Sequence, residues 1–179
     1  MEDTTGNSSK LCSGGGEEIV HSKVCAPHGF AATFRPRELF TASRGGGAHL
    51  NDRRLRVSQR RELDDSLIAT GFPFRDFSHL DEYLAIFKNL MQKTAGLRRA
   101  GSAALDLAYV AAGRYDGFWE FHLKPWDIAA GTLLIQEAGG LATDFHGEQD
   151  FFQSGNIVAG NLRIHAQLLQ QIQKELPAR

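Results

Sequence analysis

The chain has 179 residues, 42% of them hydrophobic, and a formal net charge of −1. This length allows one domain with a hydrophobic core, and the balanced charge gives no overall electrostatic footprint for nucleic acid. No apolar run approaches the roughly twenty residues that cross a bilayer, and the N-terminus is acidic, so the sequence predicts neither a membrane span nor a signal peptide.

The first segment, residues 1–36, mixes glycine, serine, threonine and charged residues without helical or alternating periodicity. Such a composition predicts a segment without regular structure. Cys12 and Cys25 lie there with no metal-ligand spacing around them, which is typical of free thiols in a reducing cytosol. We therefore expect a cytoplasmic protein with an irregular segment at 1–36 and a folded region at 37–179.

Regular patterns begin at Glu38. Residues 39–42 and 55–57 are predicted strands, joined through a glycine run and a turn at Asn51-Asp52. A basic run follows the turn, and its interpretation stays open between a solvated hairpin edge and a contact with RNA or protein. Its members are Arg53, Arg54, Arg56, Arg60 and Arg61.

Strands then alternate with helices. Residues 67–71 are predicted as a buried strand, and residues 79–93 as an amphipathic helix that carries Leu80, Leu84, Phe87 and Met91. A short strand near Leu97, a helix at 102–112 ended by Gly113 and a strand at 117–123 follow. The remaining predictions are a helix that opens at Asp127, strands at 141–145 and 156–159, and a helix at 164–176. This alternation predicts α/β layers.

The run KPWDIAAGTLLIQEAGG, at residues 124–140, contains the clearest helix signals. Pro125 and Asp127 suit the first turn, because proline lacks the N–H that stays unpaired there and aspartate accepts from the free N–H groups. A double glycine at 139–140 supplies a left-handed stop. Local chemistry alone describes a capped helix with one buried face, formed by Ala130, Leu133, Leu134 and Ala138.

Two points of the predicted layer suit a ligand. In α/β layers, ligands gather where strands end and helices begin, because free N–H groups and the helix dipole favour anions there. Gly101-Ser102-Ala103 opens one helix and Trp126-Asp127 opens another. The small residues at the first point let a ligand approach the backbone closely, although Ser102 also suits plain helix capping.

Five ordered blocks carry a resemblance to a known family. They are ELFTASRGGGA from Glu38, ATGFPF from Ala69, RRAGSAALDLAY from Arg98, WDIAAGTLLIQEAGG from Trp126 and GNIVAGN from Gly155. Together they resemble the second half of the inositol monophosphatase family, in particular its bacterial members, which are also implicated in ribosomal RNA transcription. The resemblance implies the C-terminal half of an αβαβα sandwich.

The resemblance also implies roles for individual residues. Asp127 falls on the family's C-terminal metal-binding aspartate, which holds Mg²⁺. Gly101, Ser102 and Ala103 fall on a substrate-binding stretch, and Glu120 falls where inositol-cleaving relatives place an acceptor for a substrate hydroxyl. An exposed charge at a strand end is the alternative for Glu120.

One departure from the family pattern bears on activity. The family carries Gly-Glu-Glu and then Asp-Pro-x-Asp-Gly-Thr, which supply most of its metal ligands. This chain has Gly16-Glu17-Glu18 but no Asp-Pro-x-Asp anywhere, so we do not assign these glutamates as ligands. A lone aspartate binds Mg²⁺ poorly, because the ion gives up water reluctantly and takes several carboxylates or substrate phosphates.

The resemblance thus implies a Mg²⁺-dependent hydrolase of inositol 1-phosphate that is catalytically incomplete as written, in the manner of a truncated enzyme. Two alternatives are a non-catalytic interaction module tied to transcription and a phosphatase for another sugar or nucleotide phosphate. We expect a small phosphorylated polyol as substrate and a homo-oligomer, in the simplest case a dimer, because a missing half leaves apolar surface and strand edges to cover.

Other chemically suggestive residues receive structural interpretations. Trp126 is predicted to support its loop from the core, and Asp106 to make a polar contact between helices. Arg98 and Arg99 are open between phosphate contact and ion pairing at a strand end. The seven histidines are scattered, and none pairs at metal-ligand spacing.

Overall fold

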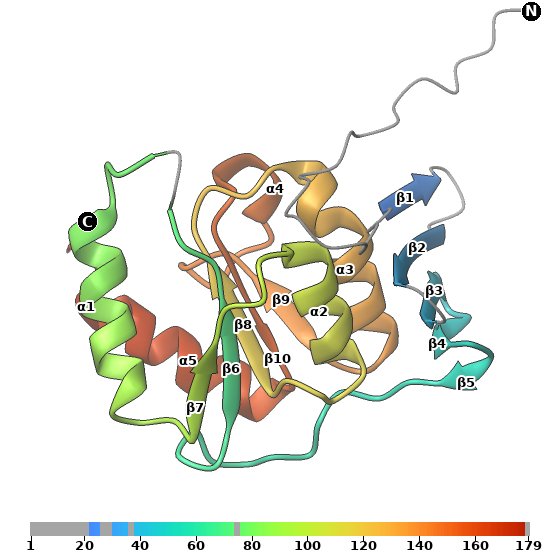
Figure 1. The fold of residues 1–179 in the computed structure, drawn as a ribbon, viewed down its shortest axis with the longest axis horizontal. Helices are drawn as coiled ribbons and strands as arrows, with labels where there is room; N and C mark the ends of the chain where they lie inside the picture. Colours follow the sequence, from blue (N-terminus) through green and yellow to red (C-terminus); the bar gives the residue numbers. More distant parts are fainter. Residues whose placement is uncertain (1–21, 26–29, 36–37, 74–75, 178–179) are drawn as a thin grey trace, which may run out of the picture.

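A computed structural model describes residues 22–25, 30–35, 38–73 and 76–177, with side chains from residue 38 onward. The elements stack as alternating sheets and helices (Figure 1). One sheet, a pair of helices, a second sheet and a further pair of helices follow one another, which confirms the predicted α/β layered class. Among the described residues, no helix has the length and apolar character to cross a membrane.

The first sheet is antiparallel, and its strands follow one another in chain order: β1 (Ser22–Cys25), β2 (Phe30–Arg35), β3 (Glu38–Ser43), β4 (Gly47–Leu50) and β5 (Arg53–Arg54). The strands β1 and β2 lie within the segment for which the sequence predicted no regular structure. The strand β2 pairs with β3, with Phe34 opposite Leu39, and such a contact between strands is not revealed by local periodicity. Cys12 and the Gly16-Glu17-Glu18 segment lie outside the described residues.

The predicted partner of β3 was wrong. The strand beside it is β4, at residues 47–50, and not residues 55–57. Asn51 and Asp52 both have left-handed φ values, 44° and 68°, which turn the chain back directly after β4. The segment at 55–57 therefore runs beyond the sheet and keeps one bond to it, from Leu55 N–H to the Ala48 carbonyl at 2.7 Å.

The second sheet is mixed, with strand order β7-β6-β8-β10-β9. The strands β6 (Leu67–Thr70), β7 (Gly96–Arg98) and β8 (Gly117–Glu120) run parallel to one another. The strand β10 (Ile157–Gly160) runs antiparallel both to β8 and to β9 (Leu141–Thr143). Three neighbouring strands therefore end at the same edge of this sheet, while β10 ends at the opposite edge.

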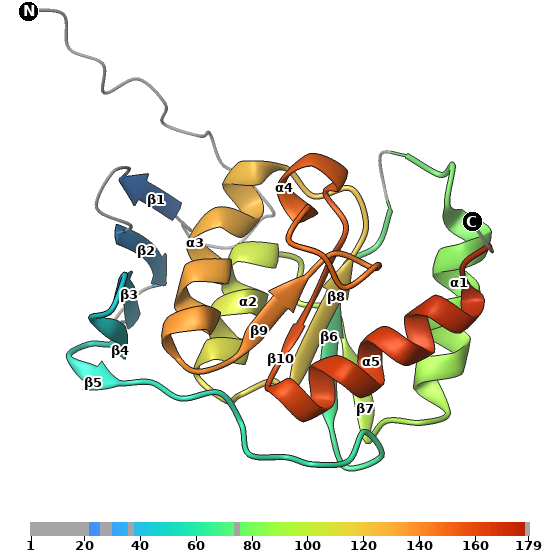
Figure 2. The ribbon, with the colours of Figure 1, turned by 180° about the vertical axis from the view of Figure 1, so that it is seen from behind.

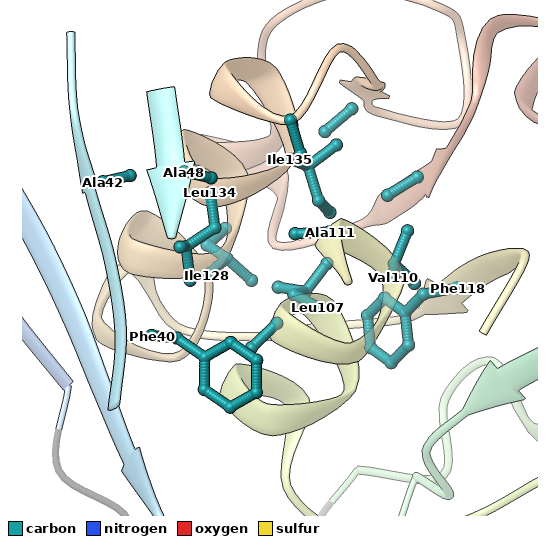
Figure 3. Close-up of a cluster of buried hydrophobic side chains, with 14 of the residues drawn as sticks. Phe40, Ala42, Ala48, Leu107, Val110, Ala111, Phe118, Ile128, Leu134 and Ile135 are labelled. Carbon is teal, nitrogen blue, oxygen red and sulfur yellow. The ribbon is translucent and has the colours of Figure 1, made fainter. Parts of the chain in front are cut away.

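The helices α2 (Ala103–Ala111) and α3 (Pro125–Glu137) fill the layer between the two sheets, as Figures 1 and 2 show. Figure 3 shows the core there: Phe40 from the first sheet, Leu107 from α2, Leu134 from α3 and Phe118 from the second sheet point toward one another. The two helices approach closely at Gly131, where a Cβ atom would lie 2.4 Å from the Cβ of Leu107. Only glycine permits this spacing of the two helices.

The helices α1 (Leu80–Met91) and α5 (Leu162–Glu175) cover the other face of the second sheet (Figure 2), and the short helix α4 spans Phe151–Ser154. The stripe that the sequence singled out on α1 faces the core only in part, through Phe87, which packs against the buried cluster. Tyr83, Ile86 and Leu90 are buried, whereas Leu84 is 51% and Met91 58% exposed. The helix therefore has a second apolar face, which is turned to solvent.

Candidate active site at the carboxyl edge of the second sheet

The candidate site lies where the parallel strands β6, β7 and β8 end. Gly71 follows β6, Arg99 follows β7, and Glu120 is the last residue of β8. The helices α2 and α3 both begin near this edge, so their N-terminal N–H groups lie beside it. Parallel pairing thus brings together residues that are far apart in the sequence, at the kind of edge where α/β proteins bind ligands.

Glu120 packs directly against the end of β6. A Cβ atom on Gly71 would lie 2.0 Å from its Oε1 atom, so the carboxyl group occupies space that only glycine leaves open. Burial, followed by the charges of Asp106 and Asp127, raises the pKa of Glu120 to about 8 against the opposing charge of Arg99. The carboxyl group therefore holds its proton near neutral pH, unlike the exposed strand-end charge that was the alternative.

Asp106, on α2, belongs to the same group of acids. Its side chain is buried, and Oδ1 has no hydrogen-bond partner among the described residues. Burial raises the pKa of Asp106 to about 7, against the opposing effects of Arg99 and a backbone hydrogen bond from Ser102. The sequence predicted an interhelical contact for Asp106 and did not place it in a group of acids. Spacing within one helix does not reveal the charges on neighbouring strands and helices.

Asp127 lies in the first turn of α3 and is partly buried. Its Oδ2 atom accepts the backbone N–H of Lys124 at 3.0 Å, and its own N–H donates to the Lys124 carbonyl at 2.9 Å. This reciprocal pair caps the helix, as the sequence predicted, although the helix begins two residues earlier, at Pro125. Among the described residues no hydrogen bond is made to Oδ1, so that oxygen remains for a ligand.

The stretch Gly101-Ser102-Ala103 opens α2 with an unusual backbone. Gly101 has a φ of +94°, a conformation that disfavours side chains, and a Cβ atom there would lie 3.1 Å from a guanidinium nitrogen of Arg99. Ser102 is the N-cap residue but makes no side-chain capping bond. The Ser102 hydroxyl is therefore not used by the helix, and the interpretation as a plain cap does not hold.

Arg99 supplies positive charge beside these acids. Its guanidinium carbon lies 5.4 Å from the centroid of the Phe72 ring, and its charge lowers the pKa values of both Asp106 and Glu120. The edge thus combines the positive charge of Arg99 with three carboxyl groups, which suits a ligand that carries both an anionic group and hydroxyls.

Two histidines meet near this edge although they stand far apart in the chain. The rings of His79 and His122 have centroids 4.9 Å apart, and Nδ1 of His122 lies 3.4 Å from Oδ2 of Asp76. Sequence spacing gave no sign of this pair, because the contact joins the start of α1 to the loop after β8. Trp126 also differs from its prediction, since it is 55% exposed and lies outside the core. Lys124 is exposed.

The described residues fit Mg²⁺ only in part. Asp127 and Glu120 are oxygen donors of the kind that this ion prefers. Burial and then the charges of Asp106 and Asp127 raise the pKa of Glu120, and a bound cation offsets the repulsion between these charges. Within the residues that the structure describes, however, no three histidine, cysteine, aspartate or glutamate side chains are arranged to hold a metal ion. Asp127 would therefore be one ligand of a site that needs others.

Comparisons with known proteins identify the family that the chain resembles. Residues 16–177 match the model of the inositol monophosphatase family, starting before the boundary expected near residue 37. Over 143 residues the chain is 61% identical to the Nus factor SuhB of Pseudomonas aeruginosa, covering 79% of this chain and 53% of that protein. It is 54% identical over 142 residues to the inositol-1-monophosphatase of Mesorhizobium japonicum, again covering 79% and 53%.

Solved structures show the same fold. The extragenic suppressor protein suhB from Bartonella henselae matches with a TM-score of 0.79 at 50% identity, over 82% of this chain and 57% of that one. The inositol monophosphatase from Anabaena matches with a TM-score of 0.74 at 39% identity, over 83% and 62%. The chain spans about half the length of the curated relatives that it matches.

Proposed function

The chain belongs to the inositol monophosphatase family, and from that premise we propose that it acts in Mg²⁺-dependent hydrolysis of a phosphomonoester, with inositol 1-phosphate as the expected substrate. The observation that carries the proposal is the group of acids at the carboxyl edge of the second sheet. Burial, followed by the charges of Asp106 and Asp127, raises the pKa of Glu120 there, and perturbed carboxyl groups in such a position are typical of catalytic sites.

Each residue at the edge has a proposed role. Asp127 offers its Oδ1 atom to Mg²⁺ while Oδ2 holds the start of α3. When bound, the ion lowers the pKa of a water molecule and stabilises the leaving oxygen. Glu120 hydrogen-bonds a substrate hydroxyl, which its raised pKa permits either as donor or as acceptor. Gly101, Ser102 and Ala103 let the polyol approach the backbone at the start of α2.

We infer that this chain needs further carboxylates for catalysis. Mg²⁺ keeps several waters and takes its remaining oxygens from carboxylates and substrate phosphate, and Asp127 supplies a single oxygen that the fold leaves available. A second copy or another subunit is the expected source of the rest. The chain alone is therefore expected to hydrolyse inositol 1-phosphate slowly or not at all.

The test is phosphate release from inositol 1-phosphate with and without Mg²⁺, comparing the wild-type chain with Asp127→Asn. Asparagine keeps an oxygen that accepts the Lys124 N–H, so the helix cap survives while the charge is lost. Asp52→Asn, which removes an exposed carboxylate in the turn after β4, is the matched control. Loss of activity in Asp127→Asn alone supports the assignment of Asp127. A Mg²⁺-dependent rate that is unchanged in this variant contradicts it. A panel of sugar and nucleotide phosphates identifies another preferred ester.

We propose as a second candidate a cytoplasmic interaction module that self-associates. Several relatives are named Nus factors, and the apolar stripe of α1, of which Leu84 and Met91 are exposed, is the observation that favours assembly. The stripe is symmetric about its midpoint, so two antiparallel copies pair Leu80 with Met91 and Leu84 with Phe87. The same arrangement brings Asp81 of one copy toward Lys88 of the other, which adds opposite charges beside the apolar contact. Proteins of the transcription machinery are the expected further partners.

A further inference from the structure

A second feature lies at the opposite edge of the second sheet. A groove of about 410 Å³ runs between residues 56–61, the end of α3 and the start of α5. Four of its lining residues are arginines, namely Arg56, Arg60, Arg61 and Arg163, and none is acidic. All four side chains are exposed. The near-zero net charge of the whole chain thus conceals a local concentration of positive charge.

The charges of these arginines are poorly neutralised by the protein. Across the part of the chain that the structure describes, the carboxylate nearest to them is that of Asp65, whose Oδ2 lies 3.9 Å from Nη1 of Arg60, and both side chains are more than half exposed. Arg56 uses one N–H for the neighbouring Leu55 carbonyl, at 2.8 Å. Four guanidinium groups of like charge repel one another, and a bound anion removes that repulsion.

The arginine segment has no regular secondary structure, yet α5 holds its backbone in place. The side-chain amide of Asn161 donates to the carbonyls of Ser58 and Arg60, at 3.0 and 2.9 Å. Gln167, six residues further along the chain in α5, donates to the Arg61 carbonyl at 2.7 Å and accepts the Leu63 N–H at 3.1 Å. These bonds fix the backbone before any ligand arrives, which lowers the entropic cost of binding.

The groove is separate from the candidate active site. The strand β10 runs antiparallel to β8, so α5, which follows β10, begins at the edge away from Glu120. The surface also changes sign beyond Arg61, because Glu62 and Asp64 line the neighbouring cavity. The positive surface thus ends at Glu62 and Asp64 on one side, and from Arg61 it extends across the groove toward Arg163.

We propose that this groove binds a chain of phosphate groups. The guanidinium fork matches phosphate oxygens in a bidentate manner and loses little hydration, so arginine rather than lysine is the residue suited to this contact. No aromatic side chain lines the groove, so it offers no platform on which bases stack, and the contact is with phosphates alone. Two sources carry this chemistry, the backbone of single-stranded RNA and free inorganic polyphosphate.

The test compares two charge-matched double variants. Arg60→Gln with Arg163→Gln removes two charges from the groove, whereas Arg53→Gln with Arg54→Gln removes two exposed charges of the same basic run outside it. The probes are a fluorescent single-stranded RNA of twelve nucleotides and inorganic tripolyphosphate. We expect about a tenfold loss of RNA affinity in the groove variant and less than about twofold in the control, with a salt slope lower by about 1.4 in the former alone.

The outcomes show both whether the groove binds phosphate chains and which ligand supplies them. If tripolyphosphate displaces the RNA at equal phosphate concentration, the groove accepts any phosphate chain; if only RNA binds, its source is nucleic acid. Equal losses in both double variants overturn the proposal, since they indicate diffuse attraction to any basic surface. Failure of both probes to bind the folded wild-type chain also overturns it. Thermal melting checks that the variants fold, and the result does not depend on phosphatase activity.

Discussion

The carboxyl group of Glu120 fills the space that the missing side chain of Gly71 leaves at the end of β6, since a Cβ atom there would lie 2.0 Å from Oε1. Gly71 is not among the residues with positive φ, so alanine meets no backbone strain at this position. The lack of a side chain at Gly71 thus makes room for Glu120, at the end of the adjacent parallel strand β8. The backbone conformation of Gly71 does not itself require glycine.

Gly71→Ala is therefore expected to move the Glu120 carboxyl group while leaving the fold intact. The displaced group gains solvent, so its pKa falls from about 8 toward its ordinary value of 4.5. Stability changes by less than about 1 kcal/mol, because the end of a flexible side chain gives way. Carboxyl carbon NMR titration measures the pKa. In a Glu120→Ala background no carboxyl group occupies the space that the new Cβ atom of Gly71→Ala needs. If Gly71→Ala destabilises this background as much as it destabilises the wild type, contact with Glu120 is not the cause.

The raised pKa values of Glu120 and Asp106 predict how stability depends on pH. The folded state retains protons that the unfolded state releases near its ordinary values of 4.5 and 3.8. Stability is therefore full below these values and falls as pH rises toward about 8. Glu120→Gln mimics the protonated acid, so its melting temperature exceeds that of the wild type at high pH and matches it at low pH. Parallel melting curves for the two proteins across this range contradict the shift.

His165 predicts the opposite trend on the acidic side. Burial lowers its pKa from 6.5 to about 4, and its Nε2 atom lies 2.9 Å from the Thr143 hydroxyl. The unfolded state binds a proton that the folded state refuses, so stability falls as pH drops from 6.5 toward 4. Melting curves in the Glu120→Gln background measure this loss of stability at acidic pH without the contribution of Glu120. Titration of the His165 ring by proton NMR measures its pKa and so shows whether this residue causes the loss of stability. A pKa at the ordinary value of 6.5 contradicts the prediction.

The contact between α2 and α3 is predicted to be intolerant of side-chain volume. Gly131→Ala places a Cβ atom 2.4 Å from the Cβ of Leu107, and neither atom moves without its helix. Overpacking of this kind costs about 1–3 kcal/mol in the free energy of unfolding. Gln136→Ala, at an exposed position of the same helix, is the matched control. Truncation of Leu107 to alanine keeps its Cβ and is not expected to rescue the variant. Urea titration measures all three.

The stripe on α1 predicts self-association that depends on charge order. Leu84→Glu places a carboxylate in the proposed contact and is expected to yield monomers by analytical ultracentrifugation. Asp81→Lys, or Lys88→Asp, weakens the dimer through like charges, whereas the combined exchange restores it. A wild-type chain that stays monomeric at high concentration contradicts the antiparallel pairing. Restoration by the combined exchange distinguishes this geometry from nonspecific adhesion, which does not depend on the order of the charges.

The sequence was sufficient to predict secondary structure where the adjacent residues in the chain determine it. The cap at Pro125 and Asp127, the stop after α3 and the buried strand β6 were all predicted, because each depends on a short stretch of chain. The α1 helix was also predicted, but its buried face was not. A helix with apolar residues on two sides has no single periodic stripe, and the position of the sheet decides which side is covered.

The electrostatics of the candidate site were out of reach of local patterns. Asp106 affects the pKa of Glu120, and His79 meets His122, only because parallel strands and the helices between them converge at one edge. The family resemblance supplied Glu120 and Asp127 as site residues, and their assigned roles remain predictions. The partner of β3 was missed for a related reason, since the turn at Asn51 and Asp52 shortens the hairpin by its backbone conformation and leaves no hydrophobic signal.

The reversed direction of β10 has a kinetic consequence. A strand of four residues separates the two edges of the sheet by roughly 13 Å, so a phosphate ester at Glu120 and a polyanion at Arg163 have room to bind at the same time. Because neither ligand displaces the other, we expect an anion in the groove to leave the KM for the ester unchanged. Any inhibition that it produces is noncompetitive, and raising the ester concentration does not reverse it.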